Sequence, residues 1–154
     1  MSRKALPPDL KTALESEYLG EIAFRLSYYL TIDARKKALM KALWALEVQT
    51  KERLLAHCRQ TGYRIPFGIS ARIKGLLYGL LTPALPWKIT IDATLKETDH
   101  FLTVFNRLLD SAAETDRPLF QYVVDHEIAI QRFAELESQS PPGDSLAAIE
   151  ALLR

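Results

Sequence analysis

The sequence has a single cysteine, almost no net charge and no long hydrophobic run. Cys58 is the only cysteine in 154 residues, which excludes an internal disulfide framework and a zinc site built from several thiolates. The sequence contains 20 Lys and Arg residues and 19 Asp and Glu residues, so the basic excess typical of nucleic-acid-binding proteins is missing. Hydrophobic residues make up 48% and charged residues 25%, which excludes a disordered chain. We expect one domain, because domains usually hold ~100–200 residues.

Segments that would carry the chain into or across a membrane are also missing. The longest nearly uncharged stretch, residues 75–87, is shorter than the ~20 residues of a spanning helix, and Pro83 and Pro86 interrupt it. The basic start Met1–Lys4 is followed by Pro7 rather than by the apolar region of a secretory signal. We therefore expect a cytoplasmic protein.

Glycine and proline divide the chain into helices. Residues 62–88 hold four of the six glycines and three of the eight prolines, which indicates a long connection. Asp33 is a good N-cap, and Gly62 stands where a left-handed residue ends a helix. An all-α bundle is expected, and its long connection allows the second and third helices to run in the same direction. The predicted elements are four core helices at about 9–31, 34–61, 89–113 and 117–138, a crossover at 62–88 with a short helix near 70–81, and a tail helix at 145–153.

Two polar residues fall inside the apolar stripes of the predicted helices. Glu47 lies between Leu43 and Leu54 on the stripe of the second core helix, and His126 is at the centre of the stripe of the fourth. A carboxylate on an apolar face is unfavourable unless it is paired, protonated or bound to a metal. The alternatives are a Glu47 at the edge of the stripe that pairs with Lys51, and a His126 that is an ordinary hydrogen-bonded core residue.

Further acidic residues and a histidine occupy related positions. Glu97 and His100 have the Glu-x-x-His spacing, which places two ligand side chains on neighbouring positions of one helix; the alternative is a solvated first turn. Glu21 lies near the middle of the first helix, where pairing with Arg25 is the alternative. Glu127 could reach the interior from the edge of the stripe around His126.

Two apolar surfaces exceed what the bundle core needs. The first helix has two apolar faces, which predicts contact with the tail helix or with another subunit, and hence a homo-oligomer. The stretch 69–87 contains apolar residues at helical spacing together with Arg72 and Lys74. An amphipathic helix there is expected to pack on the bundle or on a partner, and a membrane surface is the less favoured partner.

The arrangement resembles the ferritin-like superfamily of four-helix carboxylate proteins. In that family, two helices each supply a Glu and two others each supply a Glu-x-x-His, and together these hold two metal ions. Glu47 looks like the glutamate of the second-helix motif, with Thr50 in place of its histidine. Glu21, or less favourably Glu17, matches the glutamate of the first helix.

The second half of the chain also resembles this family, but one expected ligand is replaced. Glu97 looks like the single glutamate of the third helix. His126 looks like the histidine of the fourth-helix motif, whose glutamate is replaced by Val123. His100 and Glu127 are weaker candidates. The resemblance implies a metal site with iron or another divalent metal as cofactor, and an oxidoreductase activity based on iron.

Alternative functions follow from the same residues without a metal. A metal-free bundle could serve in association with other proteins, through the second face of the first helix and the 75–87 stretch. It could also carry an apolar molecule held beneath the crossover. The substrate is not defined by the sequence.

Overall fold

The computed structural model describes residues 4–153 of the chain and is all-helical across them, which confirms the all-α prediction. Residues 1–3 of the basic start and Arg154 lie outside the described residues. Within residues 4–153, no helix combines the length and the apolar composition that crossing a bilayer requires. In chain order the helices are α1 (Pro8–Leu30), α2 (Ala34–Thr61), α3 (Ile69–Leu81), the 3-10 turn η1 (Thr82–Ala84), α4 (Trp87–Asp110), α5 (Arg117–Glu137) and α6 (Ala147–Leu152).

Capping residues explain both ends of α2. The Asp33 side chain accepts a hydrogen bond from the backbone N–H of Lys36 at 2.8 Å, and Gly62 closes α2 with φ of 74°. The clearest differences from the expected bounds are in the tail helix, expected at 145–153 and found at Ala147–Leu152, and in α4, expected at 89–113 and found at Trp87–Asp110. α4 begins at Trp87, directly after Pro86, because proline favours the extended backbone that precedes the first residue of a helix.

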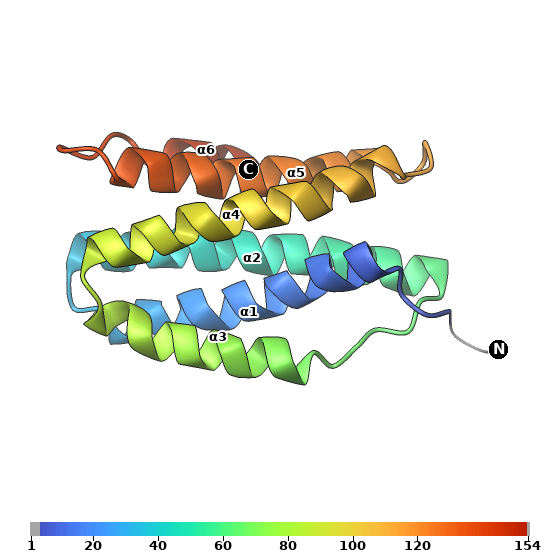
Figure 1. Cartoon of the computed structure of the whole chain (residues 1–154), viewed down its shortest axis with the longest axis horizontal. Helices are drawn as coiled ribbons and strands as arrows, with labels where there is room; N and C mark the ends of the chain where they lie inside the picture. The colour runs from blue at the N-terminus through green and yellow to red at the C-terminus, as the bar shows by residue number, and fades with distance from the viewer. Residues whose placement is uncertain (1–3, 154) are drawn as a thin grey trace.

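The four long helices form two antiparallel hairpins, α1 with α2 and α4 with α5 (Figure 1). The long crossover returns the chain to the end where α2 began, so α2 and α4 run in the same direction, as the connection lengths predict. α1 contacts α4 and α2 contacts α5, which joins the hairpins into a bundle. α6 packs on α5 and α2.

The bundle interior contains two separate apolar clusters. One holds buried residues such as Leu14, Leu54, Phe105 and Val123. The other holds buried residues such as Leu39, Leu43, Ile91 and Phe133. Along α2 and α5, the positions between the two clusters carry buried polar side chains instead. A polar layer therefore crosses the middle of the bundle, with a hydrophobic cluster on either side of it.

The crossover helix α3 packs on α1 through small residues. Ala71, Gly75 and Gly79 are its buried positions, and a Cβ on Gly75 would stand 2.7 Å from the backbone oxygen of Leu19. The two helices therefore touch almost backbone to backbone. The apolar face of α1 that carries Leu19, Ile22 and Leu26 is covered by α3, not by the tail helix that we had considered.

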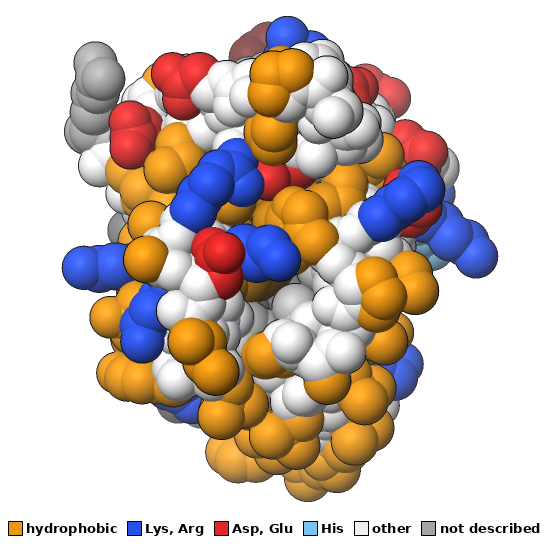
Figure 2. All heavy atoms as spheres, turned by 90° about the vertical axis from the view of Figure 1, so that its left-hand side faces the viewer, with side chains coloured by type: hydrophobic (Ala, Val, Ile, Leu, Met, Phe, Trp, Pro, Cys, Tyr) orange, Lys and Arg blue, Asp and Glu red, His pale blue; other side chains and the backbone are white. Residues whose placement is uncertain are grey.

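The large apolar residues of α3 are exposed in the structure. We expected them to pack on the bundle or on a partner; they are Ile69, Ile73, Leu76, Leu77, Leu80 and Leu81. Figure 2 shows hydrophobic side chains gathered over the lower part of the molecule, the side on which α3 lies in Figure 1. α3 does pack on the bundle, but through its small residues, because the close approach of α1 requires glycine. A partner for the exposed residues stays a prediction.

Replacing Gly75 with valine should push α3 away from α1. The added atoms have no space beside Leu19, so we expect Gly75→Val to lower the free energy of unfolding by about 1–3 kcal/mol. Urea denaturation followed by circular dichroism measures the change. Leu77→Val places the same side chain on the exposed face of α3 and should change stability by less than about 0.5 kcal/mol. Equal effects of the two substitutions would contradict the close packing.

Candidate metal centre

Three helices each contribute a ligand-type side chain to the polar layer. Glu17 comes from α1, Glu47 from α2 and His126 from α5, and all three are buried. One ligand atom of each lies within 4.8 Å of the others. His126 Nε2 stands 3.7 Å from Glu17 Oε2 and 3.8 Å from Glu47 Oε1. Glu127, also on α5 and 5% exposed, places Oε2 at 4.0 Å from the same nitrogen.

A hydrogen-bonded chain fixes the other side of the His126 ring. His126 Nδ1 lies 2.7 Å from Thr50 Oγ1, and Thr50 Oγ1 lies 3.2 Å from the hydroxyl of Tyr122. Gln49 Nε2 donates to that hydroxyl at 2.7 Å. Because Nδ1 is occupied by Thr50, the ring must direct Nε2 at the two carboxyl groups.

Gly20 makes room for the carboxyl group of Glu47. It faces α2 one turn after Glu17, and a Cβ on Gly20 would lie 2.5 Å from the carboxyl carbon of Glu47. Any larger residue at this position would displace that side chain. The glycine thus lets the carboxyl group of α2 approach α1 within the layer.

Burial keeps the group in its uncharged state. Loss of water raises the pKa of Glu17 and of Glu127 well above the usual range, and the neighbouring charge of Glu47 raises both further. Burial raises the pKa of Glu47 to about 8, although a hydrogen bond with Glu17 works in the opposite direction. Burial lowers the pKa of His126 to about 3. Without a cation, the layer at neutral pH therefore holds carboxylic acids and a neutral imidazole.

The layer forms the floor of a cavity of about 280 Å³. Glu17, Glu47, His126 and Glu127 all line it. Exposed apolar residues line it too, where the end of α3, η1 and the start of α4 meet; they include Tyr78, Leu81, Leu85 and Ile89. The buried acidic group is thus connected to the surface by a passage with mainly apolar walls.

Two of the residues singled out from the sequence, Glu47 and His126, lie together in the layer. On the first helix the structure places Glu17, rather than the favoured Glu21, beside them. Glu21 is instead 2.6 Å from Lys51 Nζ in an ion pair. Lys51, which we considered as a partner of Glu47, is therefore occupied by Glu21, and Arg25 is not the partner of Glu21.

Three further candidates, Glu97, His100 and Glu127, do not belong to the group of three ligand atoms. Glu97 is exposed but lines the cavity, and its charge raises the pKa of Glu127. His100 is exposed, and its ring stands edge-on to Phe101. Glu127 is buried next to His126, so this weaker candidate is nearer to the group than Glu97 is. Whether any of them binds a metal stays a prediction.

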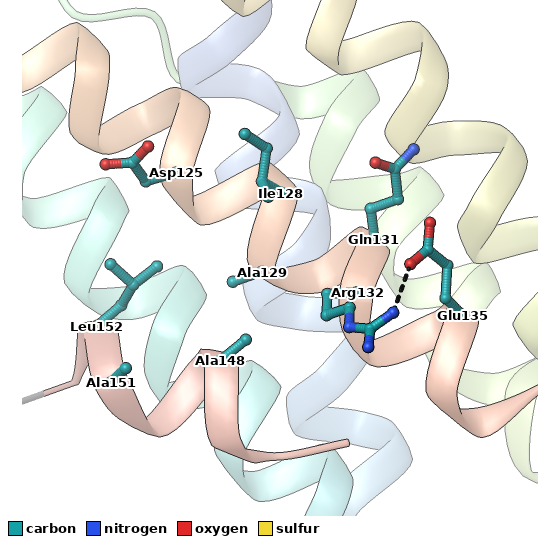
Figure 3. Close-up of a pocket in the computed structure, with 9 residues that line it drawn as sticks. All are labelled: Asp125, Ile128, Ala129, Gln131, Arg132, Glu135, Ala148, Ala151 and Leu152. Carbon is teal, nitrogen blue, oxygen red and sulfur yellow. Dashed lines mark hydrogen bonds and ion pairs between the residues drawn. The ribbon is translucent and has the colours of Figure 1, made fainter. Parts of the chain in front are cut away.

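A second pocket, of about 310 Å³, lies between α5 and α6 (Figure 3). Its polar side chains already have partners: Asp125 accepts a hydrogen bond from Gln121, and Glu135 pairs with Arg132 at 3.2 Å. Ala129, together with other small or apolar residues, lines the rest. This pocket brings no ligand-type side chains together, so it is not a candidate reaction site.

No family model, curated protein or solved structure matches the chain. The function is therefore inferred from the geometry of the polar layer. Glu17 is the residue of this layer that sequence reasoning favoured least. Its signal was present, since Glu17 follows Leu10 and Leu14 at helical spacing and precedes Gly20 by three positions.

The stability of the metal-free protein should fall as pH rises from about 4.5 to about 8. Over this range the folded chain keeps protons on Glu47 and its buried neighbours that the unfolded chain has released. The free energy of unfolding then decreases by up to about 1.4 kcal/mol per pH unit for each such carboxyl group. His126 acts oppositely between about pH 3 and 6.5 and offsets one carboxyl group there.

Urea denaturation of chelator-treated protein at several pH values measures this slope. Glu47→Gln removes one of the titrating groups and should flatten the profile. Glu52→Gln, an exposed position on the same helix, should leave the profile as it is. A free energy of unfolding that increases between about pH 6.5 and 8 would contradict the buried, protonated layer.

Proposed function

We propose that the chain is a ferritin-like metalloprotein that holds a single divalent metal ion between Glu17, Glu47 and His126. The observation that carries the proposal is that these three buried side chains each offer a ligand atom within 4.8 Å of the others. Two helical hairpins joined by a long crossover, with ligands directed inward from different helices, support the ferritin-like part.

The spacing of the ligand atoms fits an ion of ordinary size. Four ligands held tetrahedrally at about 2.1 Å from a metal are roughly 3.4 Å apart, by geometry from the usual bond lengths. The distances of 3.7 and 3.8 Å from His126 Nε2 to the carboxyl oxygens of Glu17 and Glu47 need only a small contraction. Glu127 at 4.0 Å is a fourth ligand within reach of rotation about its side-chain bonds.

The donor set supports one ion rather than two. Thr50 stands where a second histidine would be needed, and its hydroxyl is used to hold His126. Val123 stands where the family motif has a glutamate, and its side chain belongs to an apolar cluster. Glu21 is neutralised by Lys51. These substitutions remove ligands for a second metal while they leave one group of three intact.

Each residue has a definite part in holding the ion. Glu17 and Glu47 supply negative charge, His126 supplies Nε2, and Thr50 accepts the Nδ1 hydrogen that keeps this nitrogen free. Carboxylate and imidazole ligands suit iron, manganese and zinc. Such an ion supplies Lewis acidity, and iron adds one-electron chemistry, which is the basis for proposing an oxidoreductase. A cytoplasmic location and self-association stay predictions from the sequence.

The proposed ligand set contains Glu17, whereas the set favoured by the sequence contains Glu21, one turn further along α1. Glu17→Gln should abolish metal binding, because it removes a ligand of the buried group. Glu21→Gln should leave metal content unchanged, because it removes only the partner of Lys51. Elemental analysis of protein purified without chelators or a metal-affinity tag, followed by titration with Mn²⁺, measures both.

Different results would contradict the proposed ligand set and the proposed function. Metal retained by Glu17→Gln but lost from Glu21→Gln would overturn the proposed ligand set. Folded wild-type protein that contains no metal and takes up none from Fe²⁺, Mn²⁺ or Zn²⁺ would overturn the proposed function. Circular dichroism spectra of the variants establish that a loss of metal is not a loss of fold.

Thr50→Val should weaken the site without removing a ligand. The substitution keeps the shape of the side chain but leaves buried His126 Nδ1 without its hydrogen-bond partner. We expect metal affinity to fall about 10–100-fold and the unfolding free energy of the metal-free protein to fall by about 1–3 kcal/mol.

Thr61→Val is the matched control on α2. Its hydroxyl bonds only to carbonyl oxygens of the same helix, so metal affinity should stay unchanged. Competition with a fluorescent chelator gives the affinities. Unaltered affinity in Thr50→Val would show that this hydroxyl does not position the imidazole.

A further inference from the structure

We propose that the cavity above the polar layer binds a small amphiphilic amine, a molecule with a hydrocarbon body and one cationic amino group. This goes beyond the metal site, because the walls and the mouth of the cavity belong to residues that hold no metal, although its floor is formed by the proposed ligands Glu17, Glu47 and His126. Four features support it: the apolar lining, the charge of the polar groups, an unpartnered buried atom and the volume.

The walls of the cavity suit a hydrocarbon. Leu19, Phe24, Phe101 and Ile130 line it between the floor and the surface. At the mouth, Leu81 is 53% exposed and Leu85 is 43% exposed, so large apolar side chains face water where the cavity opens. A hydrocarbon chain in the cavity would remove this apolar surface from water, which is favourable by about 25 cal/mol per Å².

Acidic side chains line the cavity, and within residues 4–153 basic ones with a permanent charge do not. Glu17, Glu47, Glu97 and Glu127 line it, and no Lys or Arg does among the residues that the structure describes. An anionic head group would therefore meet only like charge or acidic hydroxyl groups. An ammonium group is complementary to these carboxyl groups, and a monovalent head needs no fixed coordination geometry.

One buried atom at the floor has no partner within the described residues. Glu17 is 1% exposed and lines the cavity, and its Oε2, which lies 3.7 Å from His126 Nε2, has no hydrogen-bond partner within residues 4–153. Thr90 also lines the cavity, and its Oγ1 is likewise unpartnered within residues 4–153. Buried polar atoms are nearly always hydrogen-bonded, so these two atoms mark positions where a ligand can donate or accept.

The volume limits the size of the ligand. About 280 Å³ holds roughly nine groups of the size of a water molecule, at ~30 Å³ each. Octylamine has about this many non-hydrogen atoms, and it carries its charge at one end. 1-Octanol and octanoate have nearly the same size, with a neutral and an anionic head, and they separate the effect of charge from that of the hydrocarbon body.

Calorimetric titration of metal-free protein near pH 7 with the three compounds tests the inference. Octylamine should bind one per chain and at least about tenfold more tightly than octanoate, with 1-octanol between them. Ala93→Trp places a large side chain in the cavity and should weaken octylamine binding at least about tenfold. Ala45→Trp makes the same change at an exposed position of α2 outside the cavity and should leave binding unchanged.

The amine site and the metal site can fail separately. Octanoate binding as tightly as octylamine, or equal effects of Ala93→Trp and Ala45→Trp, would overturn the amine site whatever the metal content. Metal content of the Ala93→Trp variant should equal that of the wild type, because Ala93 is not a ligand. Octylamine binding to a protein that takes up no metal would overturn the proposed function and support the cavity inference.

Discussion

The removal of a carboxyl-rich layer from water is the constraint on which the structure depends. Glu17, Glu47 and Glu127 lie with His126 between two apolar clusters, where bulk water cannot screen them. A buried acidic group is tolerated only as the neutral acid or next to a cation. The two clusters keep the helices together in spite of the layer.

α1 connects the parts of the molecule that matter for function. One face of α1 presents Glu17 to the layer, where Gly20 makes room for a carboxyl group from α2. Its other face supports α3, whose last turn forms part of the mouth of the cavity. The same helix therefore positions an acidic ligand and an apolar entrance. A displacement of α1 would alter both at once, which ties access to the cavity to the geometry of its floor.

Sequence reasoning placed most helices correctly because their ends carry local signals such as Asp33 and Gly62. It placed Glu47 and His126 in the interior because each stands inside a single apolar stripe. It favoured Glu21 over Glu17 because Glu21 lies nearer to the middle of the helix. Both residues lie on the same face of α1, and helical periodicity does not say which of two positions one turn apart is level with Glu47 and His126. The partner of Glu21 is Lys51, thirty positions away on another helix, and no local pattern encodes such a contact.

The backbone contact between α3 and α1 has a consequence for how the molecule fluctuates. Through Gly75 and Gly79, α3 rests on its neighbour by close approach and buries little side-chain surface, whereas its leucines remain in water. Segments with few buried apolar contacts undergo local opening at a lower free energy than the global transition. Amide hydrogens of α3 should then exchange with solvent sooner than those in the middle of α2. A local opening of α3 would widen the mouth of the cavity, where its Tyr78 and Leu81 lie, while the four long helices remain folded.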